Sequence, residues 1–253
     1  MSIKFRYLGW TAFELTFENG IRLITDPMLA GRPHEGVPVG PVQAEDLKGI
    51  NLVVISHGAG DHIGQAFDIL KLNPEAHLVC DTVTRYRALE AGIEADRIHY
   101  MVSGVQYELF GIKVKGLFAA HHSFTQLDNK QFVTAQPLSH LITGPSGERV
   151  FFGGDTSITS DHKLYGEIYK PDVALLGVGG VDILGQSCTE LYPDEAALVS
   201  KFLGVSHAFP MHYRFDEGKE FEAELAKVAP GARAVVLKSG ETFEFSRAEA
   251  VAA

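Results

Sequence analysis

Histidine and aspartate recur in this chain at one kind of position, directly after a short apolar run that is predicted to be a β-strand. The densest case is Ser56-His57-Gly58-Ala59-Gly60-Asp61-His62, which follows the β-branched run 52–55. Three further cases follow other predicted strands: His121-His122-Ser123, Asp155 after Gly153-Gly154, and His212. Loops at strand ends carry function while the strands fix their positions. The pattern therefore requires strands from most of the chain to end at a common site.

The residue types at these strand ends are those of a metal site. Imidazole and carboxylate suit zinc, manganese or iron, whereas two cysteines, Cys80 and Cys188, are too few for a thiolate zinc site. Gly58 and Gly60 are expected to let the backbone turn sharply so that neighbouring side chains converge. A single histidine at a strand end is more often a surface or hydrogen-bonded residue. Four clusters in the same context favour a metal site.

The order of predicted elements indicates an α/β fold. Asn19-Gly20 joins apolar runs over 13–17 and 21–24 and predicts a hairpin. Two more hairpins are predicted, one with its turn at Phe110-Gly111 and one joining 138–142 to 150–152. Further strands are expected over 52–55, 78–80, 173–176, 207–209, 235–237 and 242–245. Helices are expected over 66–72, 164–169, 194–203 and 217–228, with another that Thr82 caps and Gly92 ends.

This order fits two mixed sheets stacked face to face with helices outside, in a single domain over 1–253. The segment 31–41, rich in glycine and proline, is predicted to be a loop that forms a lid, a pocket wall or a plain surface excursion.

Charge and hydropathy exclude some classes of partner. Lysine and arginine number 22 against 32 aspartates and glutamates, a formal net charge of −10, which disfavours a nucleic-acid binder that works by bulk charge. The longest apolar runs fall well short of the roughly 18 residues of a membrane span, and the first residues lack a signal-peptide pattern. We expect a cytoplasmic protein with a small-molecule substrate and no nucleic-acid or membrane partner. A homo-oligomer remains open.

The motifs together resemble the metallo-β-lactamase superfamily, and within it the metal-dependent hydrolases related to the ascorbate-6-phosphate lactonase. The order and spacing match along almost the whole chain in these segments: Phe5-Arg6-Tyr7-Leu8-Gly9, Thr25-Asp26-Pro27, Ser56-His57 with Asp61-His62, Ala120-His121-His122-Ser123, Gly153-Gly154-Asp155-Thr156, and Phe209-Pro210-Met211-His212-Tyr213. The resemblance implies a four-layer αββα sandwich of two mixed β-sheets with outer helices, with metals at one edge of the sheets.

The resemblance also carries over the metal ligands, which fall on His57, Asp61, His62, His122, Asp155 and His212. In the family's pattern, His57, the residue at 59 and His122 hold one metal. The other is held by Asp61, His62 and His212, with Asp155 bridging. Position 59 is alanine here, which cannot bind a metal. Trp10 is a second departure, since close relatives often carry histidine there.

The missing imidazole predicts one tightly bound metal and a second that is weak or absent. His121, His34 or a water would be the substitute ligand. Zinc is the expected metal, with manganese, nickel or iron as alternatives. A metal-activated water would then attack a small ester, lactone or phosphodiester. Asp61 would orient that water and accept its proton, and Tyr213, with its neighbour Arg214, would stabilise the oxyanion.

Ala59 leaves other readings open. One is a degenerate member of the family that binds metal or ligand without efficient catalysis. Another is that Ala59 was introduced to trap an inactive enzyme, although the departure at Trp10 argues against this. A β-lactam substrate, nucleic-acid processing and a diiron redox role are all disfavoured by the sequence.

Overall fold

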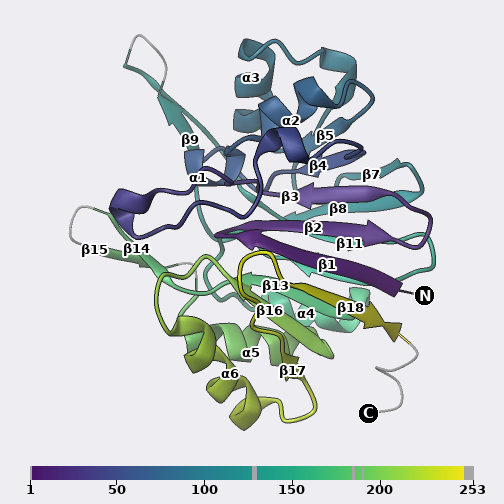
Figure 1. The fold of residues 1–253 in the computed structure, drawn as a ribbon. Helices are drawn as coiled ribbons and strands as arrows, with labels where there is room; N and C mark the ends of the chain where they lie inside the picture. The colour runs from purple at the N-terminus through teal and green to yellow at the C-terminus, as the bar shows by residue number, and fades with distance from the viewer. Residues whose placement is uncertain (1, 127–129, 184–185, 190, 248–253) are drawn as a thin grey trace.

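The computed structural model describes residues 2–126, 130–183, 186–189 and 191–247, and two seven-stranded sheets form its framework (Figure 1). The first sheet has the order β18-β1-β2-β3-β4-β5-β6. Its strands are β1 (Ser2–Gly9), β2 (Ala12–Phe17), β3 (Arg22–Thr25), β4 (Leu52–Val54), β5 (His77–Cys80), β6 (Ile98–Tyr100) and β18 (Thr242–Ser246). Pairing is antiparallel from β18 to β3 and parallel from β3 to β6, so the sheet is mixed.

The second sheet has the order β17-β16-β13-β12-β11-β8-β7 and is also mixed. Its strands are β7 (Gln106–Leu109), β8 (Ile112–Phe118), β11 (Leu138–Thr143), β12 (Arg149–Phe152), β13 (Val173–Gly177), β16 (His207–Met211) and β17 (Arg233–Ala234). Strands β12, β13, β16 and β17 run parallel to one another. Two separate hairpins extend from the sheets: β9 (Ser123–Gln126) with β10 (Phe132–Ala135), and β14 (Gly180–Ile183) with β15 (Gln186–Thr189).

Helices cover the outer face of each sheet (Figure 1). The first sheet carries α1 (Gly60–Ile63), α2 (Ala66–Leu72) and α3 (Thr82–Glu90), and the second carries α4 (Asp161–Tyr169), α5 (Pro193–Leu203) and α6 (Glu217–Val228). Short 3-10 helices are η1 (Pro33–Glu35), η2 (Ala44–Asp46) and η3 (Ala95–Arg97). The chain thus forms the predicted four-layer αββα sandwich.

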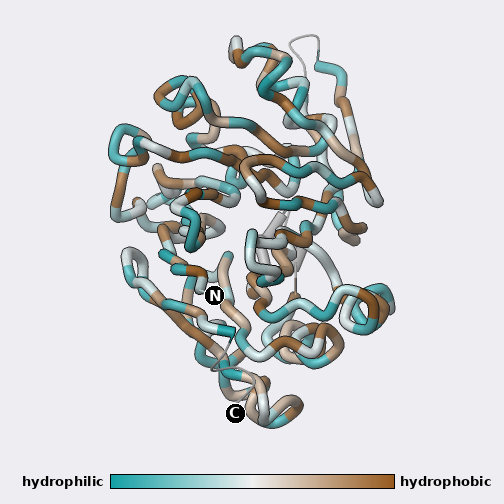
Figure 2. The backbone as a smooth tube through the Cα atoms, turned by 90° about the vertical axis from the view of Figure 1, so that its right-hand side faces the viewer, coloured by the Kyte–Doolittle hydropathy of each residue, from teal (hydrophilic) through white to brown (hydrophobic). Residues whose placement is uncertain are grey.

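Both faces of each sheet are buried, and successive side chains along a strand point to opposite faces. Figure 2 shows hydrophobic stretches recurring along the chain. Phe152 of β12 and Leu52 of β4 point into the core between the sheets. Their chain neighbours Phe151 and Val53 point outward into the layers beneath the helices. Each central strand therefore presents a continuous apolar run, as buried parallel strands do.

Most of the predicted elements are confirmed. The Asn19-Gly20 hairpin pairs β2 with β3, and α6 has the predicted bounds 217–228. The N-cap of α3 is Asp81, whose side chain accepts hydrogen bonds from the amides of Val83 and Thr84, so the assignment of the cap to Thr82 is wrong. The strand predicted over 235–237 is also wrong, because the edge strand β17 covers only Arg233–Ala234.

The predictions missed β6 and the hairpins β9–β10 and β14–β15, which are short. Within the described part of the chain, no helix has both the length and the hydropathy of a membrane span.

A buried histidine links the two sheets. His140 lies on β11, and its Nε2 donates a hydrogen bond to the carbonyl oxygen of Ile55, which follows β4, at 3.2 Å. Close by, the amide of Leu138 donates to the carbonyl of Ser56 at 3.0 Å. Burial lowers the pKa of His140 to about 4, although the bond to Ile55 opposes the shift. The neutral ring is therefore part of the folded state.

His140→Gln is expected to make the protein more resistant to acid. Because the pKa of His140 is lower in the folded than in the unfolded chain, stability falls as the pH falls from about 6.5 to about 4, by about 3 kcal/mol for this residue. Glutamine keeps a donor for the carbonyl of Ile55 but does not titrate. Urea unfolding at pH 7 and pH 4 measures the difference, with His34→Gln as the exposed control. An equal loss of unfolding free energy between pH 7 and pH 4 in the unchanged protein, His140→Gln and His34→Gln would contradict the expectation.

Candidate metal centre

One carboxylate oxygen lies at the centre of the histidine cluster. The Oδ2 atom of Asp155 is 3.1 Å from Nε2 of His62 and 3.8 Å from Nε2 of both His121 and His212. Nε2 of His57 lies 4.0 Å from the same oxygen. Four imidazoles from three segments of the chain thus lie within 4.0 Å of one oxygen.

Strand topology explains this convergence. His57 follows β4 of the first sheet, and His62 lies on the short helix α1 that comes next. Asp155 and His212 follow β12 and β16, which run parallel in the second sheet with β13 between them. Parallel strands have their carboxyl ends at the same edge, so these loops meet. His121 joins them from the segment between β8 and β9.

Two glycines permit the close contacts at this edge. A Cβ on Gly58 would lie 2.3 Å from Cγ1 of Val83, and a Cβ on Gly154 would lie 2.4 Å from Cβ of Ser56. Gly154 also has φ of +57°, which disfavours other residues. Gly58 has no such positive φ, so it is required there for space rather than for the sharp turn that we expected. Through Gly154, the loop that carries Asp155 packs directly on the loop that carries His57.

The potential ligands form two groups. One contains His57, His121 and Asp155, and the other contains Asp61, His62 and His212. In the second group, Oδ2 of Asp61 lies 3.3 Å from Nε2 of His212 and 3.9 Å from Nε2 of His62. Within each group the ligand atoms all lie within 4.8 Å of one another. Asp155 Oδ2 approaches histidines of both groups, so this carboxylate could contribute to a metal held by either group.

Asp26 orients His62 from behind. Oδ2 of Asp26 lies 2.6 Å from Nδ1 of His62 and also accepts a hydrogen bond from Oγ of Ser56 at 2.6 Å. The amide of Ser56 donates to the other oxygen of Asp26 at 2.8 Å. With Nδ1 facing a carboxylate, Nε2 of His62 points towards the cluster. Such a carboxylate behind a histidine ligand fixes its tautomer and raises its basicity.

Trp10 touches the second group. Its indole Nε1 donates a hydrogen bond to Oδ2 of Asp61 at 3.2 Å, and its ring centroid lies 4.2 Å from that of His212. The carbonyl of Trp10 accepts a hydrogen bond from the amide of His212 at 2.9 Å. Trp10, Asp26 and His212 all have positive φ, at 49°, 32° and 62°. Backbone strain of this kind gathers at functional sites.

The electrostatics of the cluster are those of a cation site. Burial would raise the pKa values of Asp61 and Asp155, but the neighbouring histidines lower both well below the ordinary range, so both carboxylates are ionised. Burial lowers the pKa values of His57 and His121, with further lowering by other histidines. Burial also opposes the charge on His62, but Asp155 and Asp26 raise the pKa of His62 well above 6.5.

A buried oxygen atom supports the fit of a metal. Oδ1 of Asp155 has no hydrogen-bond partner among the described residues, while Nε2 of His62 faces the other oxygen, Oδ2, at 3.1 Å. Leaving a buried carboxylate oxygen unpaired is costly, and a cation beside it would remove that cost. Imidazole nitrogen and carboxylate oxygen are ligands for zinc, manganese, nickel or iron. The residues present therefore fit a divalent metal.

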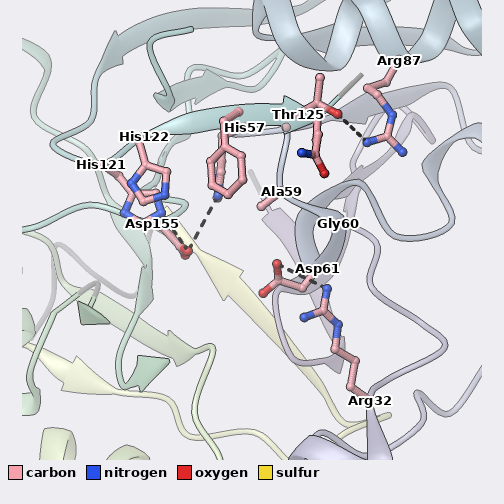
Figure 3. A pocket seen from close by; sticks show the side chains of 13 residues that line it. Arg32, His57, Ala59, Gly60, Asp61, Arg87, His121, His122, Thr125 and Asp155 are labelled. Carbon is pink, nitrogen blue, oxygen red and sulfur yellow. Dashed lines mark hydrogen bonds and ion pairs between the residues drawn. The ribbon is translucent and has the colours of Figure 1, made fainter. Parts of the chain in front are cut away.

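A pocket of about 380 Å³ opens on the cluster, and we call it the metal-side pocket. Figure 3 shows His57 and His121 directed at Asp155. It also shows Asp61 facing Arg32, and Ala59 between this pair and His57. Nη2 of Arg32 lies 3.8 Å from Oδ1 of Asp61. Because Arg32 comes from the predicted loop 31–41, that loop forms a wall of the pocket.

Five of the predicted ligands are brought together: His57, Asp61, His62, Asp155 and His212. The sixth, His122, is not in either group, and His121 takes that place. Ala120 is held by the Asp155 loop, since its amide donates to Oγ1 of Thr156 and its carbonyl accepts from Ser157. With Ala120 held in this way, His121 lies near Asp155, and the ring of His122 stacks between those of His121 and Phe124.

Two other predicted residues lie away from the cluster. His34 is 78% exposed and pairs with Glu35. Tyr213 lines a separate cavity of about 540 Å³, which we call the lateral pocket; its lining comes from the segments 7–10, 213–219 and 236–239 together with Pro38. Tyr213 packs closely on Gly218, where a Cβ would lie 2.8 Å from Cζ of the tyrosine ring. The role of Tyr213 at an oxyanion stays a prediction.

Sequence reasoning gave no role to Asp26 and did not predict the hydrogen bond from Trp10. A signal existed for Asp26, because it follows β3 and so lies at a strand end like the ligands. For Trp10 there was none, since its contact with Asp61 joins residues 51 positions apart.

Comparison with known proteins gives a family model and full-length relatives. Residues 22–213 match the model described as "Beta-lactamase superfamily domain". A "UPF0173 metal-dependent hydrolase" of Methanopyrus kandleri is 29% identical, over 96% of this chain and 100% of the relative. One from Aeropyrum pernix is 30% identical, over 98% and 99%. Among solved structures, Igni18, a metallo hydrolase from Ignicoccus hospitalis, superposes with a TM-score of 0.79 at 26% identity, over 97% and 99%.

Asp26→Asn is expected to weaken metal binding without removing a ligand. The amide cannot hold the proton on Nδ1 of His62 as a carboxylate does, so affinity should fall about 10–100-fold. Titration against a chromophoric chelator measures the affinity. Asp68→Asn, on the exposed face of α2, is the control and should bind as the unchanged protein does. Equal affinities in both variants would contradict a role for Asp26 behind His62.

Trp10→Phe is expected to lower metal affinity about tenfold. Phenylalanine keeps an aromatic ring against His212 but cannot donate to Oδ2 of Asp61. The same chelator titration applies, and thermal unfolding shows whether the variant keeps its fold. Unchanged affinity in a folded variant would mean that the indole only packs against the site.

Proposed function

The chain belongs to the β-lactamase superfamily, and from that membership and its buried histidine–aspartate cluster we propose that it is a metal-dependent hydrolase. The observation that carries the proposal is the set of four imidazoles around Oδ2 of Asp155, within 4.0 Å. The names of the relatives support the same class of activity.

The two ligand groups are unequal in this proposal. Asp61, His62 and His212, with Asp155 as a fourth ligand, hold one metal tightly. The other group offers His57, His121 and Asp155, and position 59 supplies no donor because it is alanine. A site that lacks one imidazole binds its metal weakly, so the chain purifies with one metal. Zinc is the proposed metal, and manganese, nickel and iron are the alternatives because they also bind imidazole nitrogen and carboxylate oxygen.

The substrate is a small ester, lactone or phosphodiester. The metal-side pocket has about 380 Å³, which is the size range of pockets for small molecules. Arg32 and Arg87 line it, so it offers positive charge to a substrate rich in oxygen. Nη1 of Arg87 is also fixed by a hydrogen bond to Oγ1 of Thr125 at 3.0 Å.

A bound metal activates water for attack on a carbonyl carbon or phosphorus and polarises the substrate oxygen. Asp61 is proposed to orient the attacking water and to accept its proton, and Arg32 and Trp10 hold its carboxylate on both sides. The oxyanion role predicted for Tyr213 stays outside this proposal, because Tyr213 lines the lateral pocket and not the metal-side pocket.

A degenerate protein that binds metal or ligand without efficient catalysis is the second candidate, and Ala59 is the observation that favours it. In that case the metal-side pocket would bind the same small molecules without cleaving them.

Ala59→His separates the two candidates. Elemental analysis after purification without chelator should find about one metal per chain in the unchanged protein and about two in the variant. Ala59→Leu is the control, because it adds bulk without a donor. Each protein is assayed with a panel of esters, lactones and phosphodiesters, before and after chelation.

Hydrolysis by the unchanged protein that chelator abolishes supports the enzyme. Hydrolysis by Ala59→His alone supports the degenerate protein. An unchanged protein that holds no metal overturns both candidates.

A further inference from the structure

We propose that the lateral pocket is a second binding site, for an organic anion with an apolar body. The pocket has a volume of about 540 Å³ and shares no lining residue with the metal-side pocket. The lateral pocket nevertheless adjoins the metal centre, because Trp10 lines the pocket and its indole donates a hydrogen bond to Asp61. No part of the proposed hydrolysis uses this cavity.

One side of the lateral pocket is apolar and incompletely covered. Phe215 lines it with 80% of its surface exposed, the largest exposure among the large hydrophobic residues of the described chain. Val236 and Leu237, also in the lining, are only half-buried. A ligand with an apolar body would bury these surfaces at about 25 cal/mol for each Å². Trp10 and Tyr213 supply flat aromatic faces beside them.

The charged side chains of the lateral pocket favour an anion. Three basic residues, Arg214, Lys219 and Lys238, face one acidic residue, Asp216. Lys219 is paired with Asp216 at 2.7 Å. Among the contacts of the described residues, the side chains of Arg214 and Lys238 have no ion-pair partner, in a chain whose net charge is −10. Two carboxylates bond to backbone amides of the lining: Oε2 of Glu241 accepts from Lys238 at 2.9 Å, and Oε2 of Glu217 accepts from Phe215 at 2.7 Å. Such an excess of positive charge in one cavity of an acidic protein calls for a negatively charged ligand.

Arg214 is the central contact. Its guanidinium lies over the ring of Trp10, with Cζ 5.7 Å from the ring centroid. Its Nε is buried and has no hydrogen-bond partner among the described residues. Because Nε is closed to solvent, a carboxylate or sulfonate in the pocket would pair with the outer nitrogens of the guanidinium by a charge-assisted hydrogen bond. The stacked ring holds the guanidinium in place for that contact.

The probe for this site is 1-anilinonaphthalene-8-sulfonate, which combines a sulfonate with aromatic rings. We expect one probe to bind per chain, with energy transfer from Trp10, the only tryptophan of the chain. Octanoate should displace the probe, whereas octanol, which has the same chain without the charge, should not. Equal displacement by both, or no energy transfer, would overturn the proposal.

Arg214→Gln should weaken binding of the probe about tenfold, because it removes a charge-assisted bond. Arg233→Gln is the matched control: Arg233 also stacks on an aromatic ring, that of Phe243 at 5.3 Å, but does not line the pocket. Lys238→Gln is a second variant in case Arg214→Gln does not fold, and should weaken binding at least threefold. Equal affinity in the pocket variants and the control overturns the proposal.

Chelation distinguishes a separate site from an extension of the metal centre. Because the two pockets share no lining residue, binding of the probe should persist within about threefold after the metal is removed. Loss of binding together with the metal would assign the anion to the substrate of the metal centre and overturn the second site. Metal content is measured in the same samples, so failure of the metal proposal is seen independently.

Discussion

The buried carboxylate of Asp155 is the contact on which the rest of the site depends. Its Oδ2 atom faces imidazoles from both sheets, and an ionised carboxylate at this depth is tolerated only with charged or hydrogen-bonding partners. His62 reaches it from α1 beside the first sheet, while His212 reaches it from β16 of the second. The pairing of the two halves of the sandwich and the chemistry of the site are therefore one constraint.

The framework holds this constraint by ordinary means. The apolar residues of the strands pack the two sheets against each other, and parallel strands end at the same edge, where their loops lie together. Asp26 then holds His62, and Trp10 holds Asp61, so ligands on both sides of the cluster are oriented by residues behind them. The positive φ angles of Trp10, Asp26 and His212 cost conformational free energy, and hydrogen bonds around these residues hold the backbone in that conformation.

The sequence predicted the sandwich and five of the six residues that the structure brings together, because both rest on repeated local signals, apolar strands followed by polar loops. It did not distinguish His121 from His122. The two rings stack on each other and both line the metal-side pocket, and contacts of Ala120 with the distant Thr156 and Ser157 hold the segment so that His121 is the one near Asp155. The position of Asp26 at a strand end is visible in the sequence, but its partner His62, 36 positions away, is not, and neither is the contact of Trp10 with Asp61, 51 positions away.

The contact between Gly154 and Ser56 also limits how the molecule can move. The backbone of Gly154 meets the side chain of Ser56 there without room for a further side chain, and the bonds from Leu138 to Ser56 and from His140 to Ile55 fasten the same edge. Separation of the two sheets at this edge would break all three contacts together. Small molecules would therefore reach the metal-side pocket past lining residues such as Phe124 and Gln126, with the two sheets still in contact.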